Sequence, residues 1–467
     1  MDWCFESEPV PGLGMRRLAW PRGKVAGGSS AVNGLLWVRG QAADFDGWAA
    51  AVCDPRWSAA SVLPRFERIE HEMRVGPSRC GMQRTDRSTA AFIASAAHLR
   101  VHTTADGGGG GGFRGSFAGA TDSTLQEGAG MLPVSVTPLG TRASSAAAYL
   151  EPALADSARS LELVLGAHVD RLLFGDAVGA AAGGSSTAGG QRRDDLPALC
   201  TGVQYSSGPG GGTVVRAELA AGGEVVLAAG AIGSPHILLR SGVGPPAQLE
   251  QHATEIPLVS ASPAVGQHLQ DHLQIRADFR SLTPTLNDRV NSVLGLAKMV
   301  AEYALLRTGP LTMSPTPAAA FVRSHSVVTH CCTSSDDSVT LNKLASESAS
   351  TNSDSPARPD LQLHFGPWTA AARKVSRAGV FRALDPFSAF TITACQLRPT
   401  SSGSVVLANT STVDAPLIQP NFLSTEEDAA AAVRAVRTLQ AFARVRQLFD
   451  IILGRLLPLS HTFSRAV

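Results

Sequence analysis

The sequence predicts an α/β fold in which a ligand-binding α/β layer is interleaved with a second, antiparallel sheet. Residues 222–230 form an apolar run of the kind found in parallel sheets, and a helix signal follows directly. Two later runs, residues 390–397 and 403–407, have the composition of strands in one antiparallel sheet. At 467 residues the chain is long enough for two domains with sizeable cores.

Composition and charge exclude several classes of protein. The formal net charge is +1 and no long basic or acidic block occurs, so no nucleic-acid partner is predicted. Hydrophobic residues make up 44% of the chain, but no apolar run reaches the roughly 18 residues that a membrane-spanning helix needs. The seven cysteines are scattered and form no C-x-x-C pair, which predicts reduced thiols and no metal site.

The most informative segment is the glycine-rich stretch PRGKVAGGSSAVNGLLWVRG at residues 21–40. Gly27 and Gly28 have no Cβ, so the backbone there can turn tightly and approach a ligand closely. The short polar side chains of Ser30 and Asn33 and the cation of Arg22 suit a planar or phosphate-bearing ligand. By local chemistry alone, the segment is either a ligand-binding loop or a glycine-rich turn ahead of a helix.

Periodicity and capping signals predict further elements. Residues 161–174 predict two strands joined by a turn at Gly166. Residues 293–306 predict an amphipathic helix that packs against protein or contacts a membrane surface. Ser424, with Glu427 three residues later, predicts a helix that begins with a capping box. The expected apolar face of that helix comprises Val433, Val436, Gln440 and Ala443.

Four low-complexity segments are expected to be disordered surface insertions, because they carry too little apolar surface to pack. They lie near residues 106–112, 178–193, 207–213 and 324–355. Their glycine runs lack the strand–turn–helix frame of a dinucleotide-binding fingerprint, so they are not predicted to bind phosphate.

Six segments, taken in order along the chain, resemble signatures of one enzyme family. They are residues 21–40, 140–152, 230–244, 264–272, 397–407 and 416–423. Together they resemble the glucose-methanol-choline (GMC) family of flavin oxidoreductases. The resemblance implies a GMC-type FAD-binding α/β domain, mainly in residues 1–275, interleaved with an antiparallel-sheet substrate domain, mainly in residues 276–467. It also implies FAD as the cofactor and a small-molecule alcohol as the substrate.

The same resemblance implies which residues bind the cofactor. In the family, the segment that residues 21–40 resemble runs along the FAD, and the segment beginning at Gly230 lies beside the flavin. A valine of the family contacts the adenine end, and Val169 is the nearest candidate here. The implied cofactor-binding residues are Arg22, Gly27, Gly28, Ser30, Asn33, Gly34, Val169, Gly230, Ser234 and Asp271.

Two parts of the family pattern have no match in this sequence. There is no strand–G-x-G-x-x-G–helix unit, which in the family binds the FAD pyrophosphate at a helix N-terminus. The segment with the family's catalytic histidine is also missing, since the surroundings of His461, LSHTFS, do not match it. The chain is therefore expected to be an incomplete middle portion of a GMC protein that holds FAD poorly, and no catalytic residue is identified.

The substrate region separates two branches of the family. Fatty acid photodecarboxylases share an Ala-Phe-Val-Arg element, here residues 320–323, and a Pro-Asp-Leu-Gln element, here within residues 359–365. Thr316 aligns with their pocket cysteine and His364 with their pocket arginine, so a fatty-acid carboxylate would meet no fixed cation. His364 lines the substrate pocket with Thr316, or is a core histidine.

The resemblance therefore implies an FAD-dependent oxidoreductase that acts on the CH–OH group of donors and is alcohol or choline dehydrogenase-like. Two alternatives remain open. One is a photodecarboxylase-like flavoprotein, and the other is a truncated, non-catalytic fragment.

Overall fold

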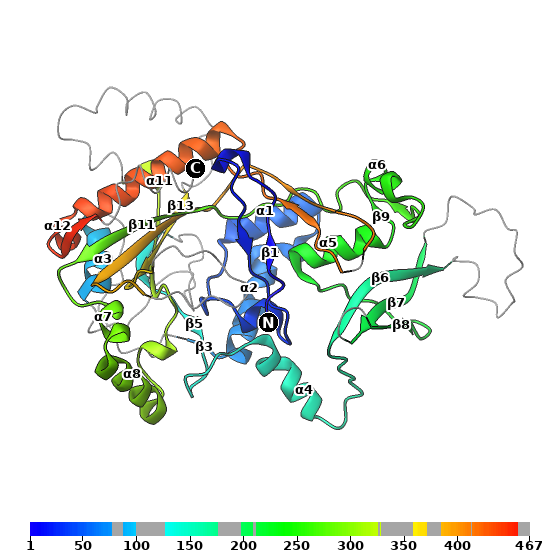
Figure 1. Ribbon diagram of the computed structural model, residues 1–467, viewed down its shortest axis with the longest axis horizontal. Helices are drawn as coiled ribbons and strands as arrows, with labels where there is room; N and C mark the ends of the chain where they lie inside the picture. Colours follow the sequence, from blue (N-terminus) through cyan, green and yellow to red (C-terminus); the bar gives the residue numbers. More distant parts are fainter. Residues whose placement is uncertain are drawn as a thin grey trace, which may run out of the picture.

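The structure is a computed structural model that describes residues 1–76, 87–99, 127–175, 198–208, 212–325, 327, 358–370, 384–411 and 413–455. A six-stranded sheet with its covering helices lies at one end of the molecule, and a three-stranded sheet lies at the other (Figure 1). The N-terminal strands and the helices α1 (Ala42–Val52) and α2 (Ala59–Glu72) lie between them (Figure 1).

The larger sheet is antiparallel throughout, in the order β17-β11-β14-β13-β12-β4. Its strands are β4 (Gly128–Met131), β11 (Gln274–Ser281), β12 (Ala318–Val322), β13 (Leu361–Gly366), β14 (Ala389–Gln396) and β17 (Ile452–Arg455). Successive side chains of a strand point to opposite faces. In β13, Leu361, Leu363 and Phe365 belong to the main hydrophobic core, so Gln362 and His364 point to the opposite face. The strand predicted at residues 390–397 is confirmed as β14.

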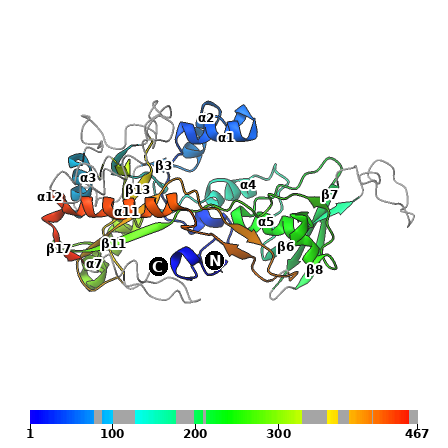
Figure 2. The ribbon, with the colours of Figure 1, turned by 90° about the horizontal axis from the view of Figure 1, so that it is seen from above.

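Three helices cover the apolar face of this sheet, and α11 lies lengthwise across it (Figure 2). They are α3 (Arg87–His98), α11 (Glu426–Arg444) and α12 (Arg446–Phe449). Aromatic rings form the centre of the core. The ring centroid of Phe92 lies 5.1 Å from that of Phe365 and 5.5 Å from that of Phe442, both in stacked pairs. The centroids of Phe365 and Phe390 lie 5.4 Å apart in a tilted pair. The helices thus occupy one face, and the other face carries the polar side chains of the strands.

Helix α11 begins one residue later than the sequence predicts. Thr425 is the N-cap, because its hydroxyl accepts a hydrogen bond from the Asp428 N–H at 3.3 Å, and Ser424 precedes it. The predicted apolar face is wrong except at Ala443, and Val433 is exposed. The buried stripe of the helix instead consists of small and apolar side chains, which include Ala431, Ala432, Ala435, Leu439 and Phe442.

The smaller sheet is an antiparallel meander in the order β6-β7-β8. Its strands are β6 (Ala167–Gly175), β7 (Leu199–Ser207) and β8 (Thr213–Glu218). β6 confirms the second strand predicted within residues 161–174, and Gly166 has a φ of +65° in the turn before it. The first strand of that prediction is wrong, since residues 161–164 form no strand in the described structure.

The strand expected over residues 222–230 is also not formed. Residues 223–228 have no assigned strand, Val226 is 83% exposed, and α5 (Gly230–Arg240) follows directly. A strand forms only where a neighbour accepts and donates its backbone hydrogen bonds. Within the described ranges, the one parallel pair joins β9 (Val243–Gly244) to β10 (Ser260–Ala261).

Each half of the chain contributes segments to the part of the molecule that the other half mainly forms. β15 (Ser404–Val406) pairs with β16 (Leu417–Gln419) in a two-stranded sheet of its own, so the prediction that residues 403–407 share a sheet with β14 is wrong. Val405 and Ile418 pack against Trp20 and against Ile232 of α5. In the other direction, α3 and β4 come from the first part of the chain and complete the larger sheet and its core. The predicted interleaving is confirmed, and the domain boundary near residue 275 stays a prediction.

The remaining elements are short, apart from α8, whose bounds match the predicted helix. They are β1 (Phe5–Glu6), β2 (Ala19–Trp20), β3 (Val75–Gly76), β5 (Val134–Ser135), α4 (Glu151–Ala155), α6 (Pro246–Leu249), α7 (Leu286–Asn291) and α8 (Val293–Leu306). Among the described residues, no helix has both the length and the apolar character needed to cross a bilayer.

The predicted insertions fall largely outside the described residues. Residues 106–112 and 178–193 lie outside them, as do His461 and most of residues 324–355. The insertion at residues 207–213 is partly described: Ser207 ends β7 and pairs with Thr213, which begins β8. The two ends of this predicted disordered loop are therefore strand residues, and residues 209–211 lie outside the described ranges.

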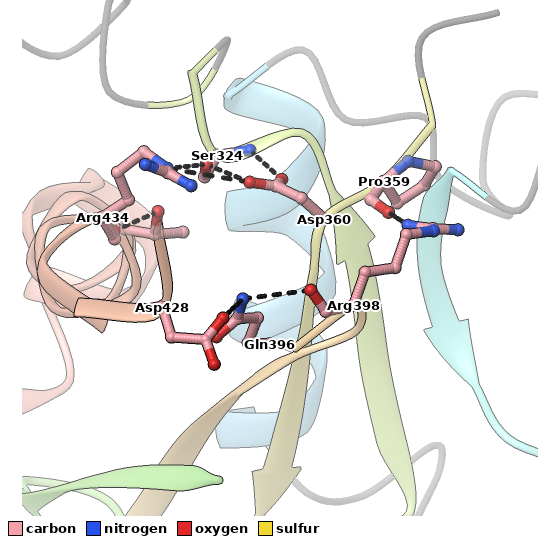
Figure 3. A network of polar contacts seen from close by, with 8 residues as sticks. Ser324, Pro359, Asp360, Gln396, Arg398, Asp428 and Arg434 are labelled. Atoms are coloured by element: carbon pink, nitrogen blue, oxygen red, sulfur yellow. Dashed lines mark hydrogen bonds and ion pairs between the residues drawn. The ribbon is translucent and has the colours of Figure 1, made fainter. Parts of the chain in front are cut away.

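A polar network connects the N-terminus of α11 to the ends of the central strands β13 and β14 of the larger sheet (Figure 3). The Asp428 carboxylate accepts hydrogen bonds from Gln396 Nε2 at 2.8 Å and from the backbone N–H groups of Thr400 and Ser401, each at 2.9 Å. Beside it, the Ser324 N–H donates to Asp360 at 2.7 Å. The first turn of α11 is therefore held to the loop that follows β14.

Arg398 carries this network toward the glycine-rich segment. It donates to the Pro359 carbonyl and to Gln41 Oε1, the latter at 3.2 Å. Arg358 and Arg398 both pair with Asp44, at 3.1 Å and 3.6 Å. Because Gln41 and Asp44 open α1 directly after residues 21–40, these contacts hold the end of that segment against the sheet.

Candidate functional site

The glycine-rich segment makes a tight turn around Gly27 and Gly28. Their φ angles are +85° and +54°, and a short 3-10 helix (Gly28–Ala31) follows. A Cβ on Gly27 would lie 3.1 Å from Ala146, so packing against the 140–152 segment requires this glycine. A Cβ on Gly28 would meet no heavy atom within 4 Å, so the space in front of Gly28 is open.

Ser30 connects this turn to the 140–152 segment. Its hydroxyl donates to the Gly27 carbonyl at 2.6 Å and accepts from the Ser145 N–H at 2.9 Å. The Ser145 hydroxyl lies 3.0 Å from Ser30 Oγ and donates to the Gly27 carbonyl at 3.2 Å. The Ser30 hydroxyl thus uses its one donor position and one of its two acceptor positions within the protein. Ser30 therefore holds two of the family-like segments together.

Asn33 and Gly34 bring the end of the turn toward the larger sheet. Asn33 Oδ1 accepts hydrogen bonds from the Leu35 N–H at 3.0 Å and from Arg142 Nη1 at 2.7 Å. A Cβ on Gly34 would lie 3.9 Å from Pro315, which directly precedes Thr316. The glycine-rich segment and the predicted substrate segment are therefore neighbours in the structure.

We expect Asn33→Ala to lower the free energy of unfolding by about 1 kcal/mol, because it removes an acceptor shared by Leu35 and Arg142. Chemical denaturation followed by circular dichroism measures this loss. Asn33→Asp keeps an acceptor oxygen at the same place and should retain most of the stability. Equal losses in the two variants would contradict the assigned hydrogen bonds.

Contacts through Trp3 connect the start of the segment to Val169. The backbone N–H of Trp3 donates to the Arg22 carbonyl at 2.9 Å, and Lys24 Nζ lies 4.4 Å from the centroid of the Trp3 ring. The Trp3 ring in turn lies 5.6 Å from the ring of His168 in β6. Arg22 and Val169 thus belong to one packed region, although 147 positions separate them in the sequence.

Gly230 and Ser234 shape the start of α5. Gly230 has a φ of +79°, and a Cβ there would meet no atom within 4 Å. Ser234 Oγ accepts a hydrogen bond from the Ala229 N–H at 3.0 Å. The helix is joined to β6 by a hydrogen bond from the Leu172 N–H to Ser241 Oγ at 2.8 Å. The predicted cofactor segments at Val169 and Gly230 therefore lie in the same part of the fold.

Asp271 lies before β11, beside the polar face of the larger sheet. Its carboxylate accepts a hydrogen bond from the His272 N–H at 2.8 Å, and His272 Nε2 lies 3.2 Å from the Leu397 carbonyl. Burial, together with the charge of Asp271, raises the pKa of the Cys395 thiol to about 12. The Cys395 thiol is therefore protonated at neutral pH and is not a nucleophile.

A transverse row of residues crosses the polar face of this sheet. Arg276 pairs with Thr393, Thr393 with His364, and His364 with Ala319. Residues paired in this way point to the same face. The row therefore brings a guanidinium, a hydroxyl and an imidazole together from three strands.

His364 is a neutral group in this row. Burial, and to a smaller extent the nearby His272, lowers the pKa of His364 to about 4. Its Nδ1 is buried and has no hydrogen-bond partner in the described part of the chain. At neutral pH His364 therefore offers an uncharged ring with a polar atom that has no partner among the described residues. The ring is half-buried and lies on the face opposite the core residues Leu363 and Phe365.

Arg276 is the charged member of the row. Its Nε donates to Asp278 at 2.7 Å and to Thr391 Oγ1 at 3.2 Å, so the charge is compensated by a carboxylate two residues along the strand. The guanidinium carbon lies 6.0 Å from the ring centroid of Trp368, and Trp368 Nε1 donates to the Pro315 carbonyl at 2.6 Å. This chain of contacts leads from the row back to the segment that holds Thr316.

Sequence reasoning selects Thr316 and His364 but misses Arg276, Thr393 and Trp368. Thr316 is half-buried, and its N–H donates to Ser314 Oγ at 3.2 Å. Alternation along β11 and β14 could have identified which side chains share a face. The row itself depends on the pairing register between strands that are distant in sequence, which the pattern of a single strand does not contain.

Comparison with known proteins identifies the family. The GMC oxidoreductase family matches residues 10–274 of the chain. An oxygen-dependent choline dehydrogenase of Brucella canis is 31% identical over 443 residues, which cover 93% of this chain. The aligned region spans 66% of the length of that relative.

Solved structures share the fold at lower sequence identity. Pyridoxine 4-oxidase from Mesorbium loti is 20% identical with a TM-score of 0.67, and the match covers all of this chain and 75% of that one. The formate oxidase of Aspergillus oryzae, in a structure of a variant studied for FAD modification, is 18% identical with a TM-score of 0.74, covering 99% and 76% of the two chains. The match of the family to more than half of the sequence, together with this shared fold, establishes that the chain belongs to the GMC oxidoreductase family.

Proposed function

We propose that this chain forms the FAD-binding and substrate-binding parts of an oxidoreductase that acts on the CH–OH group of an alcohol. The observation that carries the proposal is that Gly34 lies beside Pro315, since a Cβ on Gly34 would lie 3.9 Å from the Pro315 side chain. It brings the turn proposed to lie along the cofactor next to the polar row that contains His364. A cofactor and a substrate that react by hydride transfer must occupy neighbouring sites.

The residues present fit FAD. Gly28 and Gly230 both have positive φ angles and both face space in which a Cβ would meet no protein atom, so a planar ligand could approach either backbone closely. The residues proposed to hold the cofactor are Arg22, Gly27, Gly28, Asn33, Gly34, Val169, Gly230, Ser234 and Asp271, with Ser30 fixing the turn. When bound, FAD supplies an acceptor for the hydride that leaves the alcohol carbon.

His364 is proposed to position the substrate hydroxyl. A group whose pKa is about 4 captures a hydroxyl proton poorly at neutral pH, so His364 is not assigned as the general base. Its unpartnered Nδ1 can instead form a hydrogen bond with the substrate oxygen. This bond would orient the carbinol carbon without a change in the charge of the ring.

The charge of the polar face favours an uncharged alcohol. Arg276 is compensated by Asp278, and His364 is neutral, so the row offers no net charge to a carboxylate or to a quaternary ammonium group. This disfavours the photodecarboxylase alternative, in which a fixed cation meets a fatty-acid carboxylate. Choline remains a candidate through the relative from Brucella canis, and uncharged primary alcohols are expected to react at least as well.

The experiment uses the full gene product with its bound flavin. Anaerobic addition of primary alcohols in the dark should bleach the oxidised flavin absorbance. Under blue light, a long-chain fatty acid should yield no hydrocarbon in extracts of the same protein. Hydrocarbon production without dark bleaching would contradict the alcohol proposal, and a protein without flavin would support the non-catalytic alternative.

We expect His364→Ala to reduce kcat/KM for the best alcohol about tenfold, as for the loss of one substrate hydrogen bond. Because the pKa of His364 lies near 4, the variant should leave the pH dependence of kcat between about pH 6 and 9 unchanged. His98→Ala, at the exposed end of α3, serves as the matched control. A lost ionisation in the His364→Ala profile would show that His364 acts as the base instead.

A further inference from the structure

Helix α8 exposes apolar side chains around nearly all of its circumference. Its sequence is VLGLAKMVAEYALL, and Met299 is its one buried side chain. A helix that is hydrophobic all round is normally buried. The exposed apolar residues of α8 are Val293 (88%), Leu294 (65%), Leu296 (44%), Val300 (50%), Leu305 (80%) and Leu306 (68%).

Two neighbouring turns extend this surface, which we call the α8 patch. Leu139 is 67% exposed, and a Cβ on the adjacent Gly140 would lie 3.0 Å from the Arg307 carbonyl at the end of the helix. Leu311 is 47% exposed in the 3-10 turn (Pro310–Thr312) that follows α8. The helix lies at the periphery of the molecule, away from the β6–β8 sheet (Figure 1). Exposed apolar side chains gathered on one helix and its neighbouring turns indicate an interaction site.

The charged residues of α8 and the segment before it differ in exposure: the acidic side chains are bonded within the protein, and the basic ones are exposed. The Asp288 carboxylate accepts from the Thr285 N–H at 2.6 Å and from Ser388 Oγ at 2.8 Å, so it is used within the protein. Glu302 is half-buried and accepts from Thr308 Oγ1 at 3.5 Å. The other charged residues of positions 286–307 are Arg289, Lys298 and Arg307, and all three are exposed. The outward charges of this segment are therefore all positive.

We propose that the α8 patch binds the surface of an anionic phospholipid bilayer, with α8 lying in the plane of the interface. At about 1.5 Å per residue, the 14-residue helix is about 21 Å long, shorter than the roughly 30 Å hydrocarbon core. An apolar helix of this length that is not in a protein core suits the interface between headgroups and acyl chains. The outward cations would lie at the level of the anionic headgroups.

The alternative occupant is a second copy of the chain. A two-fold dimer through the α8 patch would bring the same surface of each copy together. Arg289, Lys298 and Arg307 of one copy would then face the same cations of the other, with the two nearby carboxylates already turned inward. The charge pattern therefore favours an anionic lipid surface over self-association.

The test is flotation of the full gene product with vesicles of phosphatidylcholine alone or of phosphatidylcholine mixed with a minor fraction of phosphatidylglycerol. We expect flotation with the anionic vesicles that weakens as salt is raised, since exposed charges are screened. Leu294→Glu/Leu305→Glu should abolish it. Val214→Glu/Val413→Glu, which alters two exposed valines outside the patch, should retain it.

A second variant separates lipid binding from misfolding. Arg289→Ala/Lys298→Ala removes two exposed cations. At roughly fivefold for each cation near the surface, we expect a loss of affinity for anionic vesicles of about 25-fold. No flotation of the wild-type protein, or equal flotation of all variants, would overturn the proposal. A dimer in light scattering that Leu294→Glu/Leu305→Glu dissociates, with no vesicle binding, would assign the patch to a second copy.

Discussion

Asp428→Ala is expected to lower the free energy of unfolding by about 3 kcal/mol, because it leaves buried polar groups without their acceptor. Asp428 is 2% exposed. Its carboxylate accepts from Gln396 Nε2 (Figure 3). It also accepts from the backbone N–H groups of Thr400 and Ser401, which connect α11 to the loop after β14. α11 covers the sheet face that contains Phe365 and Phe390, so this loss also loosens the packing of the largest core.

Because the same carboxylate is ionised in the folded protein, the free energy of unfolding should fall at acid pH. Burial alone raises the pKa of Asp428, but the hydrogen bonds from Ser401, Thr400 and Gln396 outweigh burial and lower its pKa to about 2. A carboxylate whose pKa is lower in the folded than in the unfolded state stabilises the folded protein. This contribution is fully present when the pH is above the unfolded pKa, near 3.9. That contribution, about 2 kcal/mol, is lost as the pH falls from about 4 to about 2.

Denaturant unfolding at neutral pH and at about pH 3 measures both effects. The difference in stability between the wild-type protein and Asp428→Ala should shrink at the lower pH. Asp450→Ala serves as the control, since Asp450 is exposed and its ion pair with Arg446 at 3.6 Å should contribute less than about 1 kcal/mol. Equal losses in the two variants would mean that Asp428 is not the carboxylate that holds α11.

The sequence predicts this fold well where a local pattern decides the structure. Helix α8 occupies the predicted residues, and β14 lies within one residue of the run selected for it. The capping signal places the start of α11 one residue early, because Ser424 and Thr425 are both competent N-caps and geometry selects Thr425. The interleaved architecture follows from the order of the family-like segments, and the shared fold confirms it.

Elements that depend on a partner strand are predicted less well. Residues 223–228 have the composition of a buried strand, yet the described structure supplies no neighbour to pair with them. Residues 403–407 do form a strand, but β15 pairs with β16 and not with the sheet of β14. Composition shows that a segment can form a strand, whereas the choice of partner depends on the tertiary fold.

The candidate site shows the same limit. His364 and Thr316 are found because they occupy aligned positions, and the role of both stays a prediction. Arg276 is not found, because its place in the same row as His364, with Thr393 between them, depends on the register of β11, β14 and β13. The contact of Ser30 with the ligand also stays a prediction, and what the structure adds is that its hydroxyl donates to Gly27 and accepts from Ser145.

Gly28→Val is expected to abolish flavin loading of the full gene product. The valine side chain would occupy the open space in front of Gly28 that the proposal assigns to the cofactor. It would also hold a β-branched residue at a positive φ, which costs on the order of 1–3 kcal/mol. Gly222→Val is the matched control, because Gly222 has a similar φ of +77° and a Cβ there would also meet no atom within 4 Å, but it lies in an exposed turn.

The central claim is that the turn at Gly28 lies against FAD, and the flavin content of these two variants tests it most directly. The visible absorbance of oxidised flavin, read against protein concentration after purification, gives that content for each protein. We predict that Gly222→Val retains the flavin of the wild-type protein and that Gly28→Val has lost it, while the flavin-free forms of the two variants unfold at similar temperatures. Wild-type flavin content in Gly28→Val would contradict the claim.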